Sequence, residues 1–360
     1  MKALGSLRRT IWPSGDARAV WIIDQCVLPH RFETRALATL QDAVTAIRDM
    51  WVRGAPLIGV TAAYGLALQA RTDAGDAAIA TAAEALTQAR PTAVNLAWAV
   101  QRMRQALGSV PPRERADVAW QLAGRMADED AATNEAIGRH GLPLLQAVAE
   151  RRGGVVDVLT HCNAGWLATV DWGTALAPVY QAQAAGIDVH VWVDETRARN
   201  QGAALTAWEL GQQGVRHTVV TDNAGGHLMQ HGQVDIVVVG CDRVTRRGDT
   251  CNKVGTYLKA LAAHDNGLPF YVAMPWSTLD TTLDDGLREV PIEQRAAREV
   301  THLSGRLADG RMAEVQLVPD GSAAANPAFD VTPARLVSAF ITERGVLRAA
   351  DLARMAAAAA

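Results

Sequence analysis

The hydrophobic pattern is most regular between residues 155 and 275, where short apolar runs alternate with longer segments of mixed polarity. The apolar runs are rich in valine and lie at 155–162, 188–195, 217–222, 234–242 and 269–275. The segments between them, at 173–186, 202–214, 225–232 and 252–267, are typical of helices that end at glycine. Strands that alternate with helices predict βαβ units and a parallel sheet with both faces covered. The nearly continuous apolar strands agree with burial on both faces.

The pattern of residues 21–153 is different. One or two short strands are expected near 19–28, and alanine-rich helical segments follow at 37–50, 61–70, 78–89, 93–107 and 116–130. We therefore expect an α/β protein with a mostly helical N-terminal domain with short strands, residues 1–148. It would pack against a Rossmann-like, doubly wound parallel-sheet domain, residues 149–360.

Composition narrows the class of protein. The chain has 360 residues, 49% of them apolar, and a formal net charge of −3, so neither nucleic acid nor an anionic membrane is expected as its partner. No apolar run approaches the ~20 residues that span a bilayer, and the first residues lack the apolar core of a signal peptide. Four cysteines without a CxxC pair make a zinc ribbon or a disulfide framework unexpected. We expect a cytoplasmic protein.

Polar side chains follow four of the five predicted strands. The strands end in His161-Cys162-Asn163, in Asp194-Glu195, in Asp222, in Cys241-Asp242 and in Met274-Pro275. In an open parallel sheet ligands bind beyond the carboxyl ends of the strands, so these groups are expected at one edge. Each has a simpler interpretation: an acid after a strand is often a helix cap, and a free cysteine is often a small buried hydrophobe. For His161, a structural hydrogen bond is the simpler interpretation.

Cys162 and Asp242 suggest an acid–base pair. Cys162 precedes a small-residue turn and a helix, where a thiol near basic groups has a lowered pKa. Asp242 follows three valines, and burial raises the pKa of a carboxyl group, so a protonated acid is expected. A thiolate base that faces a protonated acid would suit the movement of a proton between neighbouring carbons.

Three segments have the features of anion-binding sites. Arg53, Gly54 and Ala55 precede a proline and a helical run, a combination that places a cation and close backbone at a helix N-terminus. Arg90 precedes a second proline and a threonine cap. Asn252 and Lys253 are expected at the start of the helix after the fourth strand. Each segment could be only a helix cap with a solvated cation, but the three together favour a phosphorylated small substrate.

The motifs "VRGAPLIGVTAAYG", "RPTAVNL", "LTHCNAG", "VWVDETRARNQGAALTAWEL", "GCDRV", "GDTCNKVGTY" and "NPAFDVTP" resemble, in order and spacing, the 5-methylthioribose-1-phosphate isomerase family. The resemblance implies an aldose–ketose isomerase of methionine salvage, a homodimer without metal or nucleotide cofactor. It places the catalytic pair at Cys162 and Asp242. Phosphate and sugar contacts are implied at the following positions: Arg53, Gly54, Ala55, Arg90, Gln201, Asn252 and Lys253.

The implied chemistry gives the acid a role. The anomeric oxygen of the implied substrate is blocked by phosphate, so an acid that protonates the ring oxygen would help to open the ring. Asp242 is the candidate acid. Hydrogen must then move from C2 to C1, either as a proton carried by Cys162 or as a direct hydride shift. The sequence leaves both routes open.

Three alternatives differ in class. A non-catalytic regulatory protein of the same fold needs neither the thiol nor the acid. An isomerase of ribose 1,5-bisphosphate or 5-deoxyribose 1-phosphate would differ at the 5-position, where an apolar pocket from Trp166 and Met274 would favour a methylthio group. An NAD-dependent dehydrogenase needs a G-x-G-x-x-G turn after the first strand, and the chain has "THCNAGWLA" there.

Overall fold

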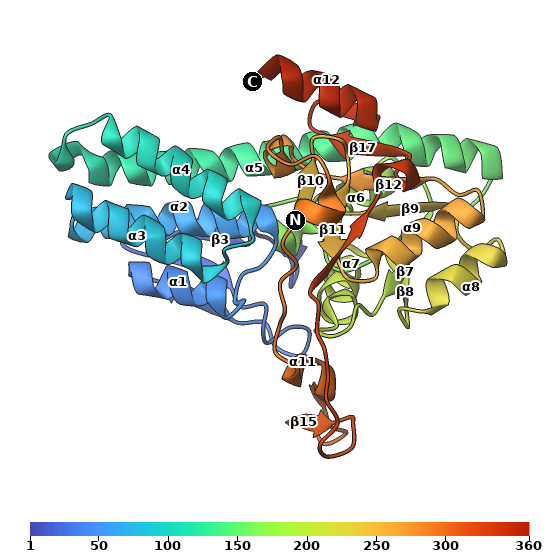
Figure 1. Ribbon diagram of the computed structural model, residues 1–360. Coiled ribbons are helices and arrows are strands. Elements are labelled where there is room, and N and C mark those ends of the chain that lie inside the picture. Colours follow the sequence, from blue (N-terminus) through green and yellow to red (C-terminus); the bar gives the residue numbers. More distant parts are fainter. Residues whose placement is uncertain (360) are drawn as a thin grey trace.

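The computed structural model describes residues 1–359, and its helical N-terminal half lies beside a large sheet (Figure 1). The first residues form two small antiparallel sheets. Their strands are β1 (Lys2–Ala3), β2 (Ser6–Leu7), β3 (Ile11–Pro13), β4 (Val20–Ile23) and β5 (Thr34–Leu37). The strand predicted near residues 19–28 is β4, in the middle of a three-stranded sheet.

Five helices form the rest of the N-terminal half, and each contains one of the predicted helical segments or most of it. They are α1 (Leu40–Arg48), α2 (Ala55–Thr72), α3 (Asp76–Ala89), α4 (Val94–Gly108) and α5 (Pro112–Arg152). Local chemistry sets several ends. Thr39 and Asp42 form a reciprocal capping box at α1, and Gly153 ends α5 at φ 67°. The helical core of alanines and leucines packs around α2.

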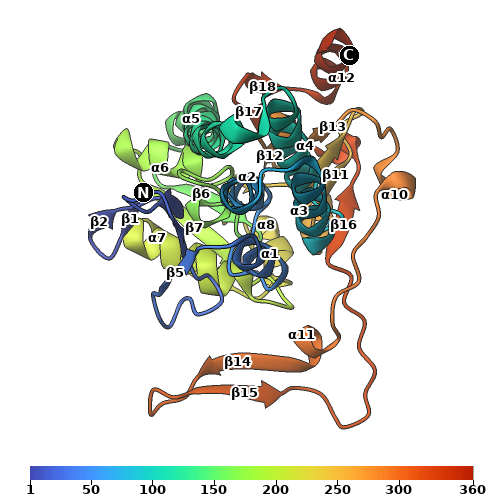
Figure 2. The same cartoon turned by 90° about the vertical axis from the view of Figure 1, so that its left-hand side faces the viewer.

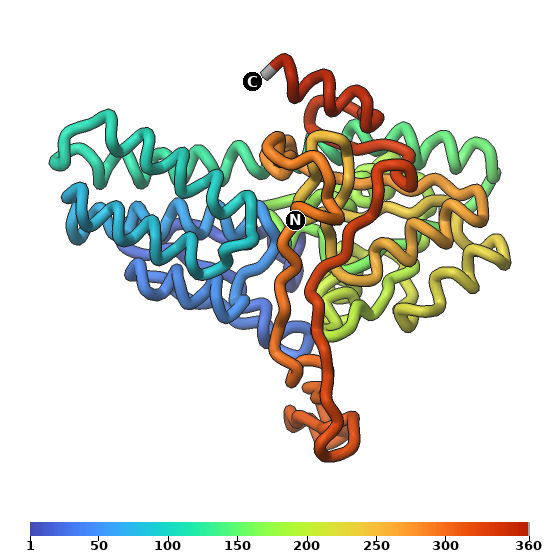
Figure 3. The backbone as a smooth tube through the Cα atoms, in the orientation of Figure 1, coloured from blue at the N-terminus to red at the C-terminus, as the bar shows by residue number. Residues whose placement is uncertain are grey.

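Helix α5 is the main difference from the expectation for this half. A helix was expected at residues 116–130, but α5 has 41 residues and crosses the molecule (Figure 3). Its first half buries Leu122 and Met126 in the helical core, whereas Ile137 and Leu145 pack against the sheet. The second half was not recognised because its apolar positions match a partner that is distant in sequence. The proposed domain division at 148/149 falls within the last turns of α5.

Seven strands form the main sheet, in the order β18-β17-β12-β9-β6-β7-β8. All neighbouring pairs are parallel except β17 and β18. The bounds are β6 (Val156–Thr160), β7 (Val189–Asp194), β8 (Arg216–Val220), β9 (Ile236–Val239), β12 (Phe270–Ala273), β17 (Ala339–Thr342) and β18 (Gly345–Leu347). The first five of these strands fall in the five predicted apolar runs. From β6 the chain adds β7 and β8 on one side, and it then returns to add β9 and β12 on the other side of β6. The strand order therefore reverses between β6 and β9, and this position is the topological switch point of a doubly wound sheet.

Successive residues of these strands face opposite cores, as the period of a strand requires. Val158 and Val238 belong to the core under α5, whereas Leu159, Val237 and Val239 belong to the core on the other face. The covering helices and turns are η1 (Trp166–Ala168), α6 (Ala177–Ala184), the π-helical turn η2 (Gly202–Thr206), α7 (Ala207–Gln213), α8 (Ala224–Gln230), α9 (Thr256–Asp265) and α12 (Ala349–Ala359). The predicted α/β fold with a large, mostly parallel sheet is therefore confirmed.

A second sheet follows β9 and corrects one expectation. Its order is β13-β10-β11-β16, and its bounds are β10 (Arg243–Thr245), β11 (Thr250–Lys253), β13 (Leu279–Asp280) and β16 (Phe329–Thr332). Asn252 and Lys253 were expected to open a helix, but they lie on β11 and pair with β16; helix α9 begins at Thr256. The prediction was wrong because pairing with β16, which is distant in the sequence, is not visible in the local pattern.

Residues 281–329 contain an arm that extends from the body (Figure 2). Its hairpin consists of β14 (His302–Arg306) and β15 (Met312–Gln316). The arm also contains α10 (Gly286–Glu289) and α11 (Arg298–Thr301), and the short turns η3 (Trp276–Thr278) and η4 (Ala334–Leu336) lie before and after it. The two ends of the arm return to the sheet edge, where Val290 and Phe329 line a cavity.

Within residues 1–359 no helix has both the length and the apolar character needed to cross a membrane.

Candidate active site

An open cavity lies at the switch point of the main sheet. Cys162 follows β6 and Asp242 follows β9, and the two strands are neighbours at this point. Both side chains line the cavity, although they are 80 residues apart in sequence. The sheet topology therefore brings together the two groups that the sequence analysis selected, at the crevice where doubly wound sheets bind ligands.

Eight of the nine residues predicted for the site line this cavity, and Asn252 does not. Its side-chain amide donates to Thr256 Oγ1 at 2.9 Å. On a strand, successive side chains point to opposite faces, so Cys251 and Lys253 reach the cavity while Asn252 faces the start of α9. The structure therefore gives no support for a substrate contact by the Asn252 side chain.

Cys162 is held by contacts on both sides of its peptide unit. Its N–H donates to Thr196 Oγ1 at 2.8 Å, and its carbonyl accepts from Thr206 Oγ1 at 2.8 Å. The residue has φ 67°, an uncommon conformation for a side chain other than glycine. The thiol donates to Gln201 Oε1 at 3.0 Å, so Gln201 orients the sulfur. Residues with an uncommon backbone conformation that several neighbouring contacts hold in place are frequent at functional sites.

The lowered pKa predicted for Cys162 is wrong. Burial raises the pKa of this thiol, because a thiolate loses its solvation there. The neighbouring cations Arg53 and Lys253 act in the opposite direction, but they do not reverse the shift. The sequence shows that basic residues are present, but it does not show how completely the sulfur of Cys162 is removed from water. Burial therefore favours the neutral form of the Cys162 thiol.

The raised pKa predicted for Asp242 is confirmed. Burial is the main cause, and the cations Lys253, Arg90 and Arg53 oppose it. The carboxyl group lines the cavity at the beginning of the segment that leads into β10, and its backbone N–H donates to Cys251 O at 3.0 Å. This hydrogen bond fixes the turn after β9 to β11. A carboxyl group with a raised pKa in a rigid position is suited to act as a general acid.

The segment Arg53-Gly54-Ala55 forms one wall of the cavity at the N-terminus of α2. Gly54 has φ 100°, and a Cβ at this position would lie 2.3 Å from Ala168 O, so only glycine fits. The buried guanidinium of Arg53 donates to both Asn163 Oδ1 and Asn163 O at 2.5 Å. A fixed cation beside the first N–H groups of a helix is a favourable site for a phosphate.

Arg90 and Lys253 add two further cations. Burial lowers the pKa of both side chains, since each charge is removed from water. Arg90 lies 3.7 Å from Glu293, and its Nε has no hydrogen-bond partner within the described residues. The Lys253 ammonium donates to Ala328 O at 2.7 Å. Buried cations with incomplete partners favour an anionic ligand, which would supply the missing acceptors.

Three arginines of the cavity were missed by the sequence analysis, Arg199, Arg243 and Arg295. Each is paired with an acid: Arg199 with Glu299 at 3.0 Å, Arg243 with Asp280 at 3.2 Å and Arg295 with Glu299 at 2.6 Å. Arg199 and Arg243 lie inside the quoted motifs "RARNQG" and "GCDRV", which was a usable signal. Arg295 offered none, because it reaches the cavity only through the fold of the arm.

The apolar side of the cavity also differs from the expectation. Trp166 and Met274 were expected to form it, but both are fully buried in the two cores of the sheet and neither lines the cavity. Several other apolar residues line it: Met50, Ile58, Val94, Val290, Pro291, Ala328 and Phe329. Most of these come from the two ends of the arm and from α2, so their meeting depends on tertiary structure.

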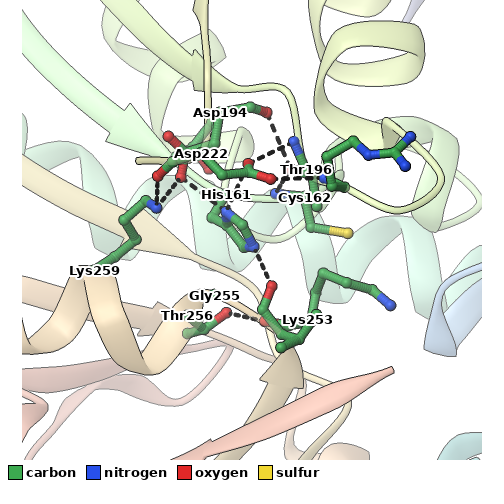
Figure 4. Close-up of polar contacts among 12 residues, drawn as sticks. His161, Cys162, Asp194, Thr196, Asp222, Lys253, Gly255, Thr256 and Lys259 are labelled. Carbon is green, nitrogen blue, oxygen red and sulfur yellow. Dashed lines mark hydrogen bonds and ion pairs between the residues drawn. The ribbon is translucent and has the colours of Figure 1, made fainter. Parts of the chain in front are cut away.

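One group of side chains beneath the cavity has the spacing of metal ligands. Potential ligand atoms of His161, Asp194 and Asp222 lie within 4.8 Å of one another. The Lys259 ammonium already lies 3.1 Å from Asp194 Oδ2 and donates to Asp222 O (Figure 4). A lysine in contact with Asp194 Oδ2, one of the potential ligand atoms, supplies the positive charge that a metal would bring. The donor set therefore does not fit a metal ion.

Comparison with known proteins places the chain among characterised families. A sequence model of the initiation factor 2 subunit family matches residues 51–349. The chain is 62% identical over 351 residues to the methylthioribose-1-phosphate isomerase of Methylorubrum populi, covering 98% of this chain and 96% of that protein. It is 59% identical over 355 residues to the methylthioribose-1-phosphate isomerase of Rhodospirillum rubrum, covering 97% and 91% of the two chains.

Two solved structures share the fold over most of the chain. The crystal structure of 5-methylthioribose 1-phosphate isomerase from Pyrococcus horikoshii has a TM-score of 0.84 and 36% identity, and covers 99% of this chain and 97% of that chain. The translation initiation factor eIF-2B subunit delta from A. fulgidus has a TM-score of 0.77 and 38% identity, and covers 94% and 96%. Similarity of fold therefore extends to both an enzyme and a translation factor.

Proposed function

The chain belongs to the initiation factor 2 subunit family, and we propose that it is an isomerase that converts 5-methylthioribose 1-phosphate to 5-methylthioribulose 1-phosphate in methionine salvage. One observation carries the proposal from the structure. A half-buried acid with a raised pKa, Asp242, and a thiol, Cys162, line one cavity with cations that can hold a phosphate. A binding protein of the same fold needs the cations but neither reactive group.

The charges of the cavity support a substrate with one phosphate. Arg199, Arg243 and Arg295 are each within 3.2 Å of a carboxylate, so their charge is largely balanced. Among the described residues, neither Arg53 nor Lys253 forms an ion pair with a carboxylate, and Arg90 has only the long contact to Glu293. Three cations with unbalanced charge match a single phosphate monoester better than a bisphosphate.

The apolar lining supports a methylthio group at the other end of the sugar. Val290, Pro291, Ala328 and Phe329 come from the two ends of the arm and lie together at the cavity. A thioether is polarisable and poorly solvated, so apolar and aromatic neighbours bind it favourably. A second phosphate at this position would meet carbon atoms instead of donors.

Ring opening is the first chemical step of the proposed reaction. Asp242 donates its proton to the ring oxygen as the bond between C1 and the ring oxygen breaks. The electron pair of that bond stays on the oxygen, which becomes the hydroxyl of C4, and C1 becomes an oxocarbenium carbon bonded to the phosphate oxygen. Burial serves this step because it keeps the acid protonated until the ring oxygen needs the proton.

Hydrogen transfer from C2 to C1 completes the reaction by one of two routes. In the proton route, Cys162 takes the proton of C2 to give an enol phosphate and returns it to C1. In the hydride route, the hydrogen of C2 moves to C1 with its electron pair, and Cys162 remains a thiol. In both routes the C2 hydroxyl returns a proton to Asp242 and leaves a ketone, so the acid is regenerated. The raised pKa of Cys162 means that the proton route must first form a thiolate.

Assembly and location are part of the same proposal. We propose a homodimer in the cytoplasm with no nucleic-acid partner, since the net charge of −3 gives a polyanion no general attraction.

The direct test is proton NMR of the purified protein with 5-methylthioribose 1-phosphate, ribose 1,5-bisphosphate and 5-deoxyribose 1-phosphate in parallel. We expect conversion of the methylthio sugar to its ketose, with a higher kcat/KM than for the other two. Faster turnover of the bisphosphate would identify the related isomerase. Absence of turnover with all three would contradict an enzymatic role and favour a regulatory binding protein.

Replacement of Arg90 with alanine tests the phosphate site. KM is expected to rise about 10- to 100-fold with a smaller change in kcat, since a hydrogen bond to a charged group contributes about 1.5–3 kcal/mol. Steady-state kinetics with the methylthio sugar phosphate measure both constants. Arg216→Ala is the control, because Arg216 pairs with Asp188 on the surface and lies outside the cavity. An unchanged KM in Arg90→Ala would remove Arg90 from the phosphate site.

A further inference from the structure

His161 lies buried at the end of β6, directly before Cys162, and both of its ring nitrogens face acceptors (Figure 4). Nδ1 lies 2.8 Å from Asp194 Oδ2, and Nε2 lies 2.9 Å from Val254 O. A carboxylate and a backbone carbonyl can only accept, whereas a neutral imidazole has a single N–H to donate. The two contacts are therefore both hydrogen bonds only when each nitrogen carries a hydrogen.

We propose that His161 is a positioning residue held as an imidazolium, which ties the Cys162 segment to the Lys253 segment and so sets the geometry of the active site. The proposal rests on the proposed function for its effect on turnover, but the protonation of His161 can be measured without substrate.

The charges around the ring agree with an imidazolium. The carboxylates that face it are Asp194 from β7, Asp222 after β8 and Asp330 from β16, and the neighbouring cation is Lys259 of α9. A neutral His161 would leave one cation among three buried or half-buried acids, and an imidazolium provides a second. Asp330 accepts from the N–H groups of Gly255 and Tyr257, so it is oriented at the same turn.

The hydrogen bonds of the ring connect the two sides of the cavity. Val254 directly follows Lys253, and Cys162 directly follows His161. Figure 4 shows the Cys162 sulfur and the Lys253 ammonium on the same side of the imidazole, with Asp194 and Lys259 on the other. The Thr196 hydroxyl donates to Asp194 O at 3.0 Å. Thr196 Oγ1 in turn accepts a hydrogen bond from the Cys162 N–H. Asp194 is thus connected to the Cys162 backbone in two ways, through the ring of the adjacent His161 and through the Thr196 hydroxyl.

Gly255 shows that the fold makes room for this contact. It has φ 107°, and a Cβ at this position would lie 2.8 Å from Cε1 of His161. A side chain there would push the turn away from the ring and break the hydrogen bond to Val254 O. The glycine is required by the approach of the imidazole as well as by its own backbone conformation.

The first experiment measures the ring directly. The full-length protein labelled with nitrogen-15 histidine is examined by NMR at neutral pH, where an unperturbed imidazole is mostly neutral. We expect His161, assigned by its absence in His161→Gln, to show two protonated ring nitrogens. His190 is an internal reference, because Asp157 accepts from its Nδ1 side while the Thr218 hydroxyl can donate to Nε2. One unprotonated nitrogen on His161 would overturn the proposal.

The second experiment compares His161→Gln with His190→Gln. An amide can donate from one end only, so His161→Gln cannot keep both contacts. We expect kcat/KM to fall about 10²-fold, the order expected when a reacting group is displaced by about 1 Å. Both constants should change, kcat through Cys162 and KM through Lys253. His190→Gln, on the same sheet and outside the cavity, should keep wild-type kinetics. Wild-type kinetics in a folded His161→Gln would overturn the role.

A metal ion is the rival explanation for the cluster, since the same three side chains have ligand spacing. Metal analysis of the purified protein after dialysis against a chelator decides between them. We expect less than stoichiometric metal and unchanged NMR signals of His161. A stoichiometric divalent ion whose removal shifts those signals would overturn the imidazolium. If His161→Gln fails to fold, the signals of the wild-type ring, assigned through its neighbours, still decide the proposal.

Discussion

Cys162→Ala is expected to lower kcat by about 10³-fold or more if the reaction follows the proton route, because the base that acts at C2 is then removed. The fold should remain intact. Alanine has a Cβ as cysteine does, so the strain at φ 67° is unchanged, and only the hydrogen bond from the thiol to Gln201 is lost. Steady-state kinetics with the methylthio sugar phosphate measure kcat, and circular dichroism with thermal unfolding confirms the fold.

Two other thiols are the matched controls for this variant. Cys251 lines the same cavity from β11, and burial raises its pKa to about 12. Cys241 directly precedes Asp242, and burial raises its pKa as well. Cys251→Ala and Cys241→Ala should each keep most of the turnover. If Cys162→Ala turns over at the wild-type rate, Cys162 has no role in catalysis.

The same assay separates the two routes of hydrogen transfer when the substrate carries deuterium at C2. A hydride shift delivers all of the deuterium to C1, whereas a proton held by the Cys162 sulfur can exchange with water before it is returned. The ionisation of Cys162 gives a second criterion. In the proton route the rate rises as the pH rises through the raised pKa of the thiol, because the thiolate is the base. In the hydride route no such rise is expected.

Asp242→Asn is the second change with a large expected effect. It should lower kcat by about 10²–10⁴-fold, the usual contribution of a general acid. The amide has nearly the same shape as a protonated carboxyl group and keeps a donor, but it cannot transfer a proton to the ring oxygen. KM should therefore change little. A variant that retains wild-type kcat would show that Asp242 acts only through a hydrogen bond.

The pH dependence follows from the raised pKa of Asp242. The acid must be protonated, so the wild-type rate is expected to fall as the pH rises through this pKa, and the residual rate of Asp242→Asn should lack that fall. The free energy of unfolding is expected to change with pH in the same direction as the rate. A raised pKa in the folded state means that the folded chain binds the proton more tightly, so stability falls as the pH rises above the unfolded pKa. Asp242→Asn should therefore unfold at the same or a higher temperature at neutral pH.

Asp235→Asn is the matched control at the opposite end of β9. Asp235 accepts from Arg152 at 2.5 Å and from the N–H of Asp157 at 2.9 Å, far along the strand from the cavity. Its replacement is expected to lower the unfolding temperature and leave kcat unchanged. Asp242→Asn should thus lower kcat without lowering the unfolding temperature, whereas Asp235→Asn should lower the unfolding temperature without changing kcat. This difference separates a catalytic acid from a structural acid on the same strand.

The two residues of the proposed acid–base pair could be predicted because their positions follow from strand ends. Cys162 and Asp242 come directly after apolar runs, and a parallel sheet brings the carboxyl ends of its strands to one edge. The Arg53 segment could be found because glycine and proline identify the start of a helix. Arg295 and Phe329 could not be found in this way, since they belong to the arm, whose ends meet the sheet only in the folded chain.

The direction of the Cys162 pKa was decided by tertiary structure alone. The sequence shows which cations are present, but not how much water remains around the sulfur, and here desolvation outweighs Arg53 and Lys253. The same applies to Asn252, because the face to which its side chain points depends on pairing with β16. Burial and register are properties of contacts between distant segments, and no local pattern contains them.

The sequence by itself determined the alternation of strands and helices, the family, and the thiol and acid at the strand ends, because each depends on residues that are adjacent or regularly spaced. Only the tertiary structure decided that β6 and β9 are neighbours at the switch point, that α5 joins the two cores, and that His161 bridges the Cys162 and Lys253 segments. These features arise from packing between segments that are distant in the sequence, so they depend on which surfaces meet in the folded chain.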